Sequence, residues 1–576
     1  MKYFFNLFRY NIPRMQDLDY NNYPFITLND RQVCDYELLA NGGFSPLDGF
    51  MTKSDYESCV ENMRLKNGEL WTMPIVLHVS NTIVNNIKDS PYVVLKHKTG
   101  LPLAIVDIQD KKESVYQPNI QNECAKVYRT NDDNHPYVKI LKTYEQEGLT
   151  WCIGGKLVWK VLPPQYDFSK YRLTPKQTKD MIAKNNWKKV IGFQTRNPMH
   201  RSHYELTKYA LRKAGEDSHV LIQPVVGVTQ ECDVNYHTRV KCYLKLLQNY
   251  EPDTAQLCLL PLSMRMAGPR EAVWHSQIRK NYGCTHFVVG RDHAGPSFKT
   301  KEGESFYGPY DAQDLLYKHA NEIGIIPITS KMIVYATPKN NKGDGVYMPI
   351  DEIDETKYQA NHISGTQQRK LLTNGDEIPD WFSFPEVVGE LRKEYLSKVQ
   401  QGLCLYFVGL SGCGKTTIAN FIISRLRELT HRKITYLDGD IVRTHISKGL
   451  GFTKEDRSTN VRRIGYICSE VTKHNGIAVA ANIAPYDLDR EVNRKMISAH
   501  GNYVEIFIDT PLEVCESRDV KGLYKLAREG KIKEFTGISD PFEKPKNQDI
   551  LIDGTDNLDK SINKIICYLQ EHSYLE

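Results

Sequence analysis

The stretch Gly409-Leu-Ser-Gly-Cys-Gly-Lys-Thr416 (GLSGCGKT) fits the phosphate-binding pattern G-x-x-x-x-G-K-[ST] at every fixed position. It follows an apolar run, LCLYFV (403–408), and precedes a helical pattern whose apolar face includes Phe421. In that context the glycines let backbone N–H groups wrap phosphates, Lys415 reaches the outer phosphates and Thr416 ligates Mg²⁺. The stretch therefore predicts a P-loop α/β domain that holds a nucleoside triphosphate. It leaves the acceptor of the phosphate open.

The C-terminal region continues with apolar runs at 434–437, 477–481, 503–508 and 549–552, separated by helical segments. The first of these runs ends in Asp438-Gly-Asp440. Two carboxylates at a strand end beside a phosphate-binding loop suit Mg²⁺ binding and deprotonation of an acceptor hydroxyl. A simple turn explains the same three residues equally well.

Arginines gather in the segment GFTKEDRSTNVRRIG (451–465). Arg457, Arg462 and Arg463 are candidates for binding an anionic acceptor, because guanidinium groups bind phosphate and sulfate in a bidentate fashion. Arginines on a solvated helix face usually bind nothing specific. Both interpretations stay open at this point.

A second α/β alternation precedes the P-loop domain. Apolar runs at 187–193, 220–227, 256–262 and 285–290 are separated by helical segments, which favours a parallel, Rossmann-like sheet. Ligands bind such sheets at the carboxyl ends of the strands.

Two strand ends in this region carry polar residues. The first run leads into Gln194-Thr-Arg-Asn-Pro-Met-His200-Arg-Ser-His203, and the last into Gly290-Arg-Asp-His-Ala-Gly-Pro296. We expect His200 and His203 to share one face of a first helical turn near Arg196, an arrangement that suits a charged phosphoryl group. A surface histidine pair or a metal site is the alternative.

The N-terminal region, from about residue 23 to 167, has mainly short strand-like runs, with a hairpin turn at 98–100. It predicts a small β-rich, PUA-like domain without a catalytic constellation. The expected fold class is multidomain α/β, with the β-rich domain at 1–168, a nucleotidyltransferase domain at 169–395 and a P-loop kinase domain at 396–576. The second domain includes a small mixed subdomain at about 335–395.

Composition excludes several classes of protein. Lys plus Arg number 75 and Asp plus Glu 70 in 576 residues, so no basic surface for nucleic acid is indicated. No apolar run is long enough to span a membrane. The 13 cysteines form no C-x-x-C pair, which favours a reducing, cytoplasmic location. Residues 1–16 contain three basic and no acidic side chains, so an organellar presequence is an alternative.

The C-terminal region resembles adenosine 5′-phosphosulfate (APS) kinase. The matching segments, in order, are GLSGCGKTT, LDGDIVR, LGFTKEDRSTNVRRIG, APYDLDR, PLEVCESRDVKGLYKLAREG and EFTGISDPFE. The resemblance implies transfer of phosphate to the ribose 3′-hydroxyl of APS, with Lys415 and Asp440 as catalytic residues and Thr416 and Asp440 as Mg²⁺ ligands. The ATP site implied comprises Gly409, Ser411, Gly412, Cys413, Gly414, Lys415, Thr416 and Thr417. The APS site implied comprises Asp438, Asp440, Arg443, Phe452, Arg457, Asn460, Ile483, Ala484, Lys521, Phe535 and Thr536.

One position departs from many stand-alone APS kinases. Ala484 stands where they have a serine, and the same alanine occurs in kinase-like fungal domains that act as allosteric sensors. Those domains are altered in the P-loop and in the paired carboxylates, whereas Lys415, Thr416, Asp438 and Asp440 are all present here. An active kinase is therefore the main hypothesis, and a non-catalytic module that binds APS or its phosphorylated product is the alternative.

The region 25–395 resembles ATP sulfurylase. FQTRNPMHRSH, VVGVT, HTRV, GRDHAGPS and FYGPYDAQ carry the resemblance, together with NGGFSPLDGFM (41–51) and ISGTQQR (363–369). It implies the reaction of ATP with sulfate to give APS and pyrophosphate. The catalytic residues implied are Thr195, Arg196, Asn197, His200 and His203. The sulfate and ATP contacts implied are Gln194, Thr195, Arg196, Asn197, Gly290, Arg291, Asp292, His293, Ala294 and Ile333.

Together the two resemblances predict a bifunctional enzyme that makes APS and then 3′-phosphoadenosine 5′-phosphosulfate (PAPS). The expected ligands are ATP with Mg²⁺, sulfate, APS, PAPS and pyrophosphate, with no tightly bound organic cofactor. We expect no nucleic-acid or membrane partner, and a homo-oligomer by analogy with both families. An enzyme running the first reaction backwards and a nucleotide-binding scaffold without activity are weaker alternatives.

Overall fold

The computed structural model describes residues 22–165, 167–230, 233–329, 332–340, 344–396, 398–519 and 522–575. It divides into two compact units. The first unit comprises Met1–Ser364 with Ile378–Leu391, and the second comprises Gly365–Glu377 with Arg392–Glu576. Residues 1–16, considered above as a presequence, lie outside the described residues.

The N-terminal part of the first unit is a mixed α/β domain rather than a mainly stranded one. One sheet has the order β1-β4-β5-β8-β2 and the other the order β3-β7-β6. The predicted hairpin is confirmed, since β4 and β5 pair antiparallel around Gly100. The strands are β1 (Phe25–Thr27), β2 (Gly49–Phe50), β3 (Leu77–Val79), β4 (Tyr92–Lys96), β5 (Pro102–Asp107), β6 (Val115–Tyr116), β7 (Trp151–Ile153) and β8 (Gly155–Lys160).

Six helices lie between these strands, and the sequence prediction did not include them. The first begins at a capping box, in which the Asn29 side chain accepts the Gln32 N–H and the Gln32 side chain accepts the Asn29 N–H. That signal is present in the sequence, but the strand-like runs dominate the pattern of this region. The helices are α1 (Asp30–Asn41), α2 (Lys53–Asn62), α3 (Asn81–Ile87), α4 (Lys111–Ser114), α5 (Ile120–Val127) and α6 (Pro136–Gln146).

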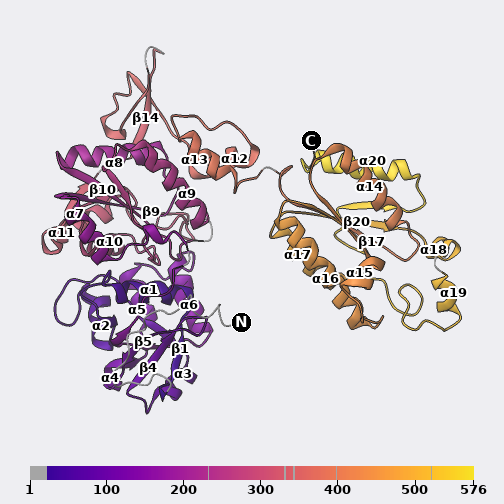
Figure 1. The fold of residues 1–576 in the computed structure, drawn as a ribbon, viewed down its shortest axis with the longest axis horizontal. Coiled ribbons are helices and arrows are strands. Elements are labelled where there is room, and N and C mark those ends of the chain that lie inside the picture. Colours follow the sequence, from indigo (N-terminus) through magenta and orange to yellow (C-terminus); the bar gives the residue numbers. More distant parts are fainter. Residues whose placement is uncertain are drawn as a thin grey trace, which may run out of the picture. The chain divides into compact units, whose positions relative to one another are not determined.

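The second part of the first unit is built on a five-stranded sheet, which is parallel throughout, as predicted. Its order is β11-β10-β9-β12-β13. In Figure 1, α8 and α9 cover one face and α10 and α11 the other. The elements are α7 (Pro175–Lys184), β9 (Lys189–Thr195), α8 (Arg201–Ala214), β10 (Ser218–Pro224), α9 (Tyr236–Leu246), β11 (Ala255–Leu257), α10 (Pro269–Asn281), β12 (His286–Val289), α11 (Asp311–Ile323) and β13 (Ile326–Thr329).

The strand order sets the position of the ligand site. From β9 the chain adds β10 and β11 on one side and later returns to place β12 and β13 on the other. The carboxyl ends of β9 and β12 therefore form the switch point of the sheet, where α/β folds bind ligands. A three-stranded antiparallel sheet follows, from β14 (Ile333–Pro338), β15 (Val346–Pro349) and β16 (Tyr358–Asn361), and α13 spans Pro385–Arg392.

Both parts of the first unit share one hydrophobic core. Phe44 of the N-terminal part packs against Trp274 of α10, with ring centroids 5.1 Å apart. Arg265 and Asp35 form a fully buried ion pair at 2.6 Å across the same boundary. Breaking such a pair leaves an uncompensated buried charge, so the two parts are held in one arrangement.

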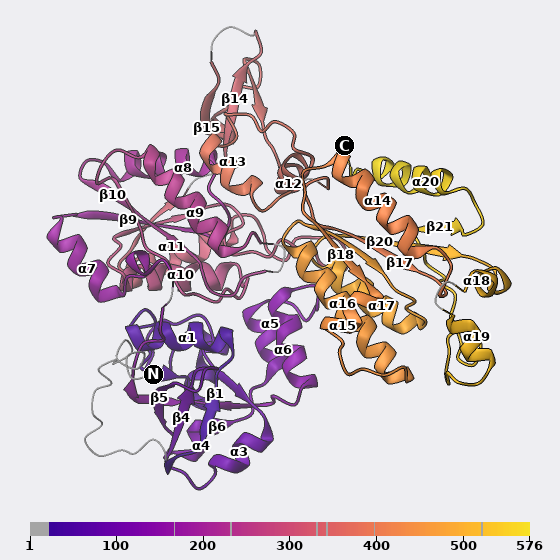
Figure 2. The ribbon, with the colours of Figure 1, turned by 45° about the vertical axis from the view of Figure 1, so that its right-hand side comes forward.

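The second unit is a parallel five-stranded sheet of order β18-β19-β17-β20-β21. Alternate residues of its central strand enter two different cores, Leu403, Leu405 and Phe407 on one face and Cys404, Tyr406 and Val408 on the other. Such two-sided burial explains why these strands are continuous apolar runs in the sequence. Figure 2 shows α14 and α20 on one side of the sheet and α16 and α17 on the other.

The elements of the second unit match the predicted runs closely. Phe421 is the exception, because it is 51% exposed although it was placed on the apolar face of its helix. The bounds are α12 (Gly365–Asn374), β17 (Leu403–Val408), α14 (Lys415–Leu429), β18 (Ile434–Asp438), α15 (Gly439–His445), α16 (Lys454–Lys473), β19 (Ile477–Ala481), α17 (Asp487–Ser498), β20 (Asn502–Asp509), α18 (Leu512–Arg518), α19 (Leu523–Arg528), β21 (Ile550–Asp553) and α20 (Leu558–Glu571).

Two further observations concern the described residues as a whole. None of their helices combines the length and apolar character needed to cross a lipid bilayer. All twelve cysteines among them are free thiols.

Candidate active sites

The loops after β9 and β12 meet at the switch point of the first sheet. Arg196 follows β9, and its guanidinium donates to the Ser297 hydroxyl at 2.9 Å. The other terminal nitrogen of Arg196 lies 2.9 Å from the sulfur of Met266. Arg196 thus joins three segments that are far apart in the sequence, and it places a permanent positive charge between them.

The turn after β9 is built by its own polar groups. The Thr195 hydroxyl donates to the carbonyl oxygen of Asn197 at 2.9 Å and accepts the Asn197 N–H at 3.1 Å. Thr195 therefore shapes the turn that carries Arg196. Gln194 has a buried side-chain oxygen with no hydrogen-bond partner among the described residues. Because an amide can rotate by 180°, this position can also present an N–H₂ donor, the group that an oxyanion would need.

Two residues of α9 support this turn, and sequence reasoning gave neither of them a role. The buried guanidinium of Arg239 donates to the carbonyl oxygens of Arg196, at 2.7 Å, and Val225, at 2.9 Å. The Tyr243 hydroxyl donates to the carbonyl oxygen of Asn197 at 2.8 Å. Arg239 belongs to the HTRV motif, which was the one signal in the sequence that could have identified it.

His200 and His203 lie together at the start of α8, as predicted. His200 is the N-cap residue, and its backbone N–H donates to Nδ1 of His203 at 3.2 Å. The ring of His200 stacks on Phe382, 4.7 Å between centroids, and its Nδ1 lies 3.0 Å from the Ser383 hydroxyl. Burial lowers the pKa of His203 to about 4. His203 is therefore neutral at physiological pH, with its proton on Nε2, and it is a hydrogen-bond donor to anything beyond that nitrogen.

The segment from Gly290 to Ala294 is a compact loop with unusual backbone angles. Asp292 and Ala294 have φ values of 53° and 57°, in the left-handed region that side chains rarely adopt. The N–H of Asp292 donates to the carbonyl oxygen of Pro309 at 2.9 Å, and the carbonyl oxygen of Ala294 accepts the N–H of Gly268 at 3.2 Å. Strained backbone of this kind is typical of ligand-binding loops.

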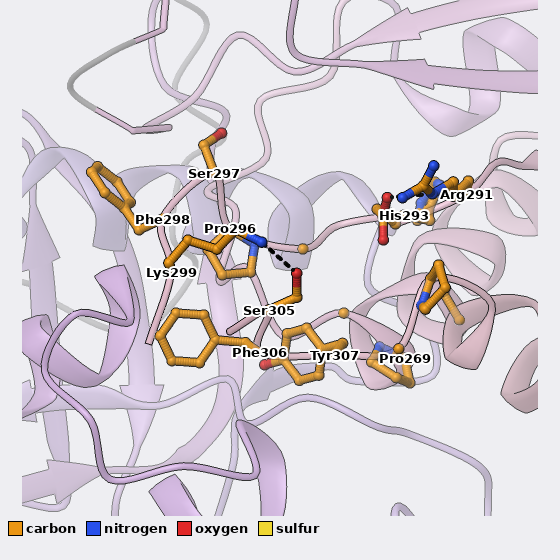
Figure 3. Close-up of a pocket in the computed structure, with 16 residues that line it drawn as sticks. Pro269, Arg291, His293, Pro296, Ser297, Phe298, Lys299, Ser305, Phe306 and Tyr307 are labelled. Atoms are coloured by element: carbon orange, nitrogen blue, oxygen red, sulfur yellow. Dashed lines mark hydrogen bonds and ion pairs between the residues drawn. The ribbon is translucent and has the colours of Figure 1, made fainter. Parts of the chain in front are cut away.

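This loop forms one wall of a cavity of about 290 Å³. Figure 3 shows Arg291 and His293 at one end and Phe298, Lys299 and Phe306 at the other. Arg291, Asp292 and His293 are the predicted residues that line the cavity, and Ser297, the partner of Arg196, lines it too. Ile333 is the first residue of β14 in the small antiparallel sheet and is not among the residues that line this cavity.

The P-loop of the second unit connects β17 to α14, as predicted. A side chain at Gly409, where φ is 154°, would collide with the sulfur of Cys413 and the carbonyl oxygen of Ile508, both 2.7 Å from the added carbon. The ammonium of Lys415 is buried and donates to the carbonyl oxygens of Gly409, at 3.0 Å, and Leu410, at 2.7 Å. The loop thus has the tight backbone and the interior lysine that bind phosphates.

The carboxylates of Asp438 and Asp440 have different structural roles. Asp438 is the N-cap of α15 and accepts the N–H of Asp440 at 3.0 Å. It also accepts hydrogen bonds from Tyr436, at 3.0 Å, and from the hydroxyl of Thr416, at 3.3 Å. Asp438 therefore fixes the P-loop threonine against the strand end and positions Asp440 on the first turn of α15. This arrangement is not an isolated turn.

The guanidinium of Arg457 forms hydrogen bonds to other residues of the protein. Its guanidinium donates to the Thr536 hydroxyl at 2.5 Å, to the carboxylate of Asp540 at 2.9 Å and to the carbonyl oxygen of Glu534 at 2.6 Å. Its Nε donates to the carbonyl oxygen of Phe452 at 2.9 Å. Residues 534–540, called the strap below, are held to α16 in this way. Phe535 and Thr536, two predicted APS contacts, belong to the strap.

The next predicted acceptor residues are Arg443, Phe452, Asn460 and Lys521. The Arg443 guanidinium lies over the ring of Phe452, 4.4 Å from its centroid, and Phe452 is 63% exposed. Asn460 is buried, and its side-chain oxygen has no hydrogen-bond partner among the described residues. Such an atom is an expected ligand contact. Lys521 lies outside the described residues.

The other two arginines considered as candidates for binding an anion have protein partners as well. Arg462 donates to Asp489 at 2.8 Å, and Arg463 donates to the carbonyl oxygen of Ile446 at 3.0 Å. Ala484 is buried with φ of 44°, and its carbonyl oxygen accepts from Arg490 at 2.6 Å. The position departs from many related kinases in sequence, but its backbone is firmly held.

A parallel sheet with polar loops at its switch point, followed by a P-loop beside two carboxylates, defines the class. The chain joins a nucleotide-binding α/β domain to a domain of the P-loop kinase type. Comparison with known proteins gives the family. Residues 13–160 match the PUA-like domain, residues 169–394 the ATP-sulfurylase family and residues 401–553 the adenylylsulphate kinase family.

Curated relatives match over the full length. A sulfate adenylyltransferase of Gibberella zeae is 42% identical over 99% of this chain and 98% of its own, and one of Yarrowia lipolytica is 42% identical over 95% and 94%. A solved structure of a hexameric APS kinase from Thiobacillus denitrificans is 28% identical, with a TM-score of 0.74 over 97% of this chain and 95% of that one. The chain belongs to the sulfate adenylyltransferase family and carries a C-terminal adenylylsulphate kinase domain.

Proposed function

We propose that the protein activates sulfate in two steps. The first unit joins sulfate to the adenylyl group of ATP, giving APS and pyrophosphate. The second unit transfers the γ-phosphoryl group of another ATP to the 3′-hydroxyl of APS, giving PAPS. The observation that carries the proposal is the intact set of Lys415, Thr416, Asp438 and Asp440 in a chain whose first unit has the residues for making APS.

In the first step an oxygen of sulfate attacks the α-phosphorus of ATP, and pyrophosphate leaves. Two anions must be brought together, so positive charge and oriented donors do most of the work. The guanidinium of Arg196 and the side-chain amide of Gln194 would hold sulfate, with the backbone near Ala294. His203, neutral and with its proton on Nε2, would donate to phosphate oxygens without a change of protonation. Thr195 and Asn197 would keep the Arg196 turn in shape.

In the second step the chain's residues position ATP and the acceptor. Lys415 would exchange its two carbonyl partners for phosphate oxygens, because an ammonium prefers an anionic acceptor. Asp440 would take the proton of the 3′-hydroxyl or face the metal. The oxygen donors of Thr416 and Asp440 fit Mg²⁺, which would neutralise charge on the β- and γ-phosphates when bound. Phe452 and Phe535 would contact APS.

A second candidate is a first unit that makes APS and a second unit that only senses nucleotides. The curated relatives quoted above are named for the first activity alone. Ala484 also fits the resemblance to kinase-like sensor domains noted in the sequence analysis. The complete P-loop favours the kinase, since a sensor has no need of a base or of a metal ligand at the acceptor.

The two candidates are separated by one assay. The purified protein is incubated with Mg-ATP, labelled sulfate and pyrophosphatase, and the labelled nucleotides are resolved. Labelled PAPS supports the kinase, and its loss in Lys415→Ala with APS still made assigns it to the P-loop. APS alone in the unmodified protein supports the sensor, and no labelled nucleotide refutes both candidates.

Assembly and location follow as further proposals. The related Thiobacillus denitrificans protein is described as a hexameric APS kinase, which supports a homo-oligomer here. Light scattering coupled to gel filtration would measure the oligomeric state. The twelve free thiols support a reducing compartment such as the cytoplasm, which fractionation would test.

A further inference from the structure

Three side chains, of which two are fully buried, form a chain that ends at the cavity of the first unit. Glu271 and His275 lie one turn apart on α10, and Oε1 of Glu271 is 3.2 Å from Nε2 of His275. Nδ1 of His275 is 3.1 Å from Nε2 of His293, in the loop after β12. Glu271 and His275 are fully buried. Neither has a role in the mechanism described so far.

The proton positions in this chain follow from its buried end. Burial alone would raise the pKa of Glu271, but the contact with His275 and the N–H groups of Arg265, at 3.0 Å, and Ala267, at 2.8 Å, lower it below its ordinary value. Glu271 is thus an ionised carboxylate, which only accepts hydrogen bonds. Nε2 of His275 forms no other polar contact among the described residues, and its approach to Glu271 is a short ion-pair contact rather than an aligned hydrogen bond.

His275 therefore carries its proton on Nε2. Burial lowers the pKa of His275 despite Glu271, so the ring is neutral and holds a single proton. Its Nδ1 must then be an acceptor, and the hydrogen atom in the 3.1 Å contact belongs to Nε2 of His293. Burial, with His275 and the guanidinium of Arg279 nearby, lowers the pKa of His293 well below its ordinary value. The remaining nitrogen of His293, Nδ1, is left as a bare acceptor.

His293 lines the 290 Å³ cavity, where Figure 3 places it beside Arg291. An acceptor nitrogen repels phosphate oxygens, which are also acceptors. The nucleoside half of ATP, by contrast, has donors in the amine of its base and the hydroxyls of its ribose. His203 has the opposite arrangement, because its Nδ1 accepts the His200 N–H and its Nε2 is the donor. The two histidines suit opposite ends of one nucleotide.

We propose that Glu271 and His275 act as positioning residues that fix His293 as a hydrogen-bond acceptor for a donor group on the nucleoside half of ATP. The proposal rests on the proposed adenylyl transfer for its ligand. The tautomer itself is a property of the free protein. Its two tests are therefore separate.

The first test reads the tautomer directly in the protein without nucleotide. Histidine is labelled with ¹⁵N, and the His293 signals are assigned by their loss in His293→Ala. The expected spectrum has protonated Nε2 and unprotonated Nδ1, and a mixed tautomer in Glu271→Gln, whose amide can donate to His275. Protonated Nδ1 or a doubly protonated ring in the unmodified protein overturns the proposal. If Glu271→Gln does not fold, the spectrum of the unmodified protein still decides.

The second test asks which part of ATP His293 contacts. Sulfate-dependent pyrophosphate release is measured in a Lys415→Ala background, so that the kinase does not consume ATP. We expect His293→Ala to raise the KM for ATP about ten-fold, the effect of one hydrogen bond to a buried group, with the inhibition constant of tripolyphosphate unchanged. His97→Ala, a histidine of the N-terminal domain, is the matched control.

Nucleotide analogues identify the donor. The purine triphosphate without the amine and the two deoxyribose triphosphates are compared in the same assay. In the unmodified protein, one of the three analogues should have a KM about ten-fold higher than that of ATP. In His293→Ala, the KM of this analogue and the KM of ATP should be equal. The proposal is contradicted if His293→Ala weakens the binding of ATP and of tripolyphosphate equally, or if it affects neither. Absence of any pyrophosphate release from the unmodified protein refutes the proposed function instead and leaves the spectroscopic result to decide the tautomer.

Discussion

Arg457→Met should release the strap of the second unit and thereby weaken the binding of APS. The arginine makes three hydrogen bonds to the strap, through Glu534, Thr536 and Asp540, and a fourth to Phe452. Methionine replaces the apolar stem of the side chain but can form none of these bonds. The effect is therefore expected in the strap and not in the core of α16.

The magnitude follows from the burial of the ion pair. The side chains of Arg457 and Asp540 are 8% and 15% exposed. Removing one partner of a buried pair costs about 3–5 kcal/mol. Asp540 keeps some solvent contact and a 2.9 Å hydrogen bond from Tyr486, so we expect the lower end, about 3 kcal/mol. At 1.4 kcal/mol for each factor of ten, the strap should open roughly 100-fold more often.

Hydrogen exchange with mass spectrometry measures this opening. The N–H groups of Gly537 and Ile538, bonded at 2.8 Å to Asp540 and 3.0 Å to Phe535, should exchange roughly 100-fold faster, and the KM for APS should rise. Arg463→Met, which removes a single exposed hydrogen bond from the same helix, should change neither quantity. Weaker APS binding with unchanged exchange in the strap would refute the reasoning, because Arg457 would then act on APS directly.

Three further predictions concern single residues. Lys415→Ala should lower the rate of 3′-phosphorylation at least about 100-fold and leave adenylyl transfer unchanged. Lys560→Ala, the control, loses only a surface ion pair and should alter neither activity. Equal loss of both activities in Lys415→Ala would contradict separate sites. Arg196→Met should lower kcat/KM for sulfate by a factor of about 10²–10³, measured as pyrophosphate release. Arg212→Met is the control. An unchanged KM for sulfate in Arg196→Met would exclude Arg196 from the anion site. Burial lowers the pKa of His203 from 6.5 to about 4, so its neutral ring stabilises the fold above pH 6.5 and this contribution is lost as the pH falls toward 4. Between pH 7.5 and pH 5, the free energy of unfolding should therefore fall by about 2 kcal/mol less in His203→Gln than in the unmodified protein. Urea unfolding followed by tryptophan fluorescence reports this for the first unit, which contains all six tryptophans, and identical pH dependence would contradict a neutral His203.

The second unit could be predicted closely because its strands are buried on both faces. The run LCLYFV has no polar residue to blur its limits, and β17 spans those same residues. Phe421 was misplaced because α14 packs on the sheet through Ile418, Ile422 and Leu426, and a helical face is wide enough to take in a neighbour that remains exposed. The N-terminal helices were omitted although the Asn29–Gln32 capping box was readable.

The candidate sites could be located from sequence, but their supports could not. The loops at 194–203 and 290–296 follow strands, so the parallel sheet alone brings them to one edge. Arg239 and Tyr243 reach the same turn from α9, and His275 reaches His293 from α10. No spacing in the chain encodes such contacts. The contacts of Arg457 with the strap could not be predicted for the same reason, since Thr536 and Asp540 lie some 80 residues further along.

The central claim is that one chain makes APS in its first unit and phosphorylates it in its second. Its most direct test follows labelled sulfate through the unmodified protein with Mg-ATP and pyrophosphatase. We expect the label to accumulate in PAPS, and to stop at APS in Lys415→Ala. Label that stops at APS in the unmodified protein would contradict the claim.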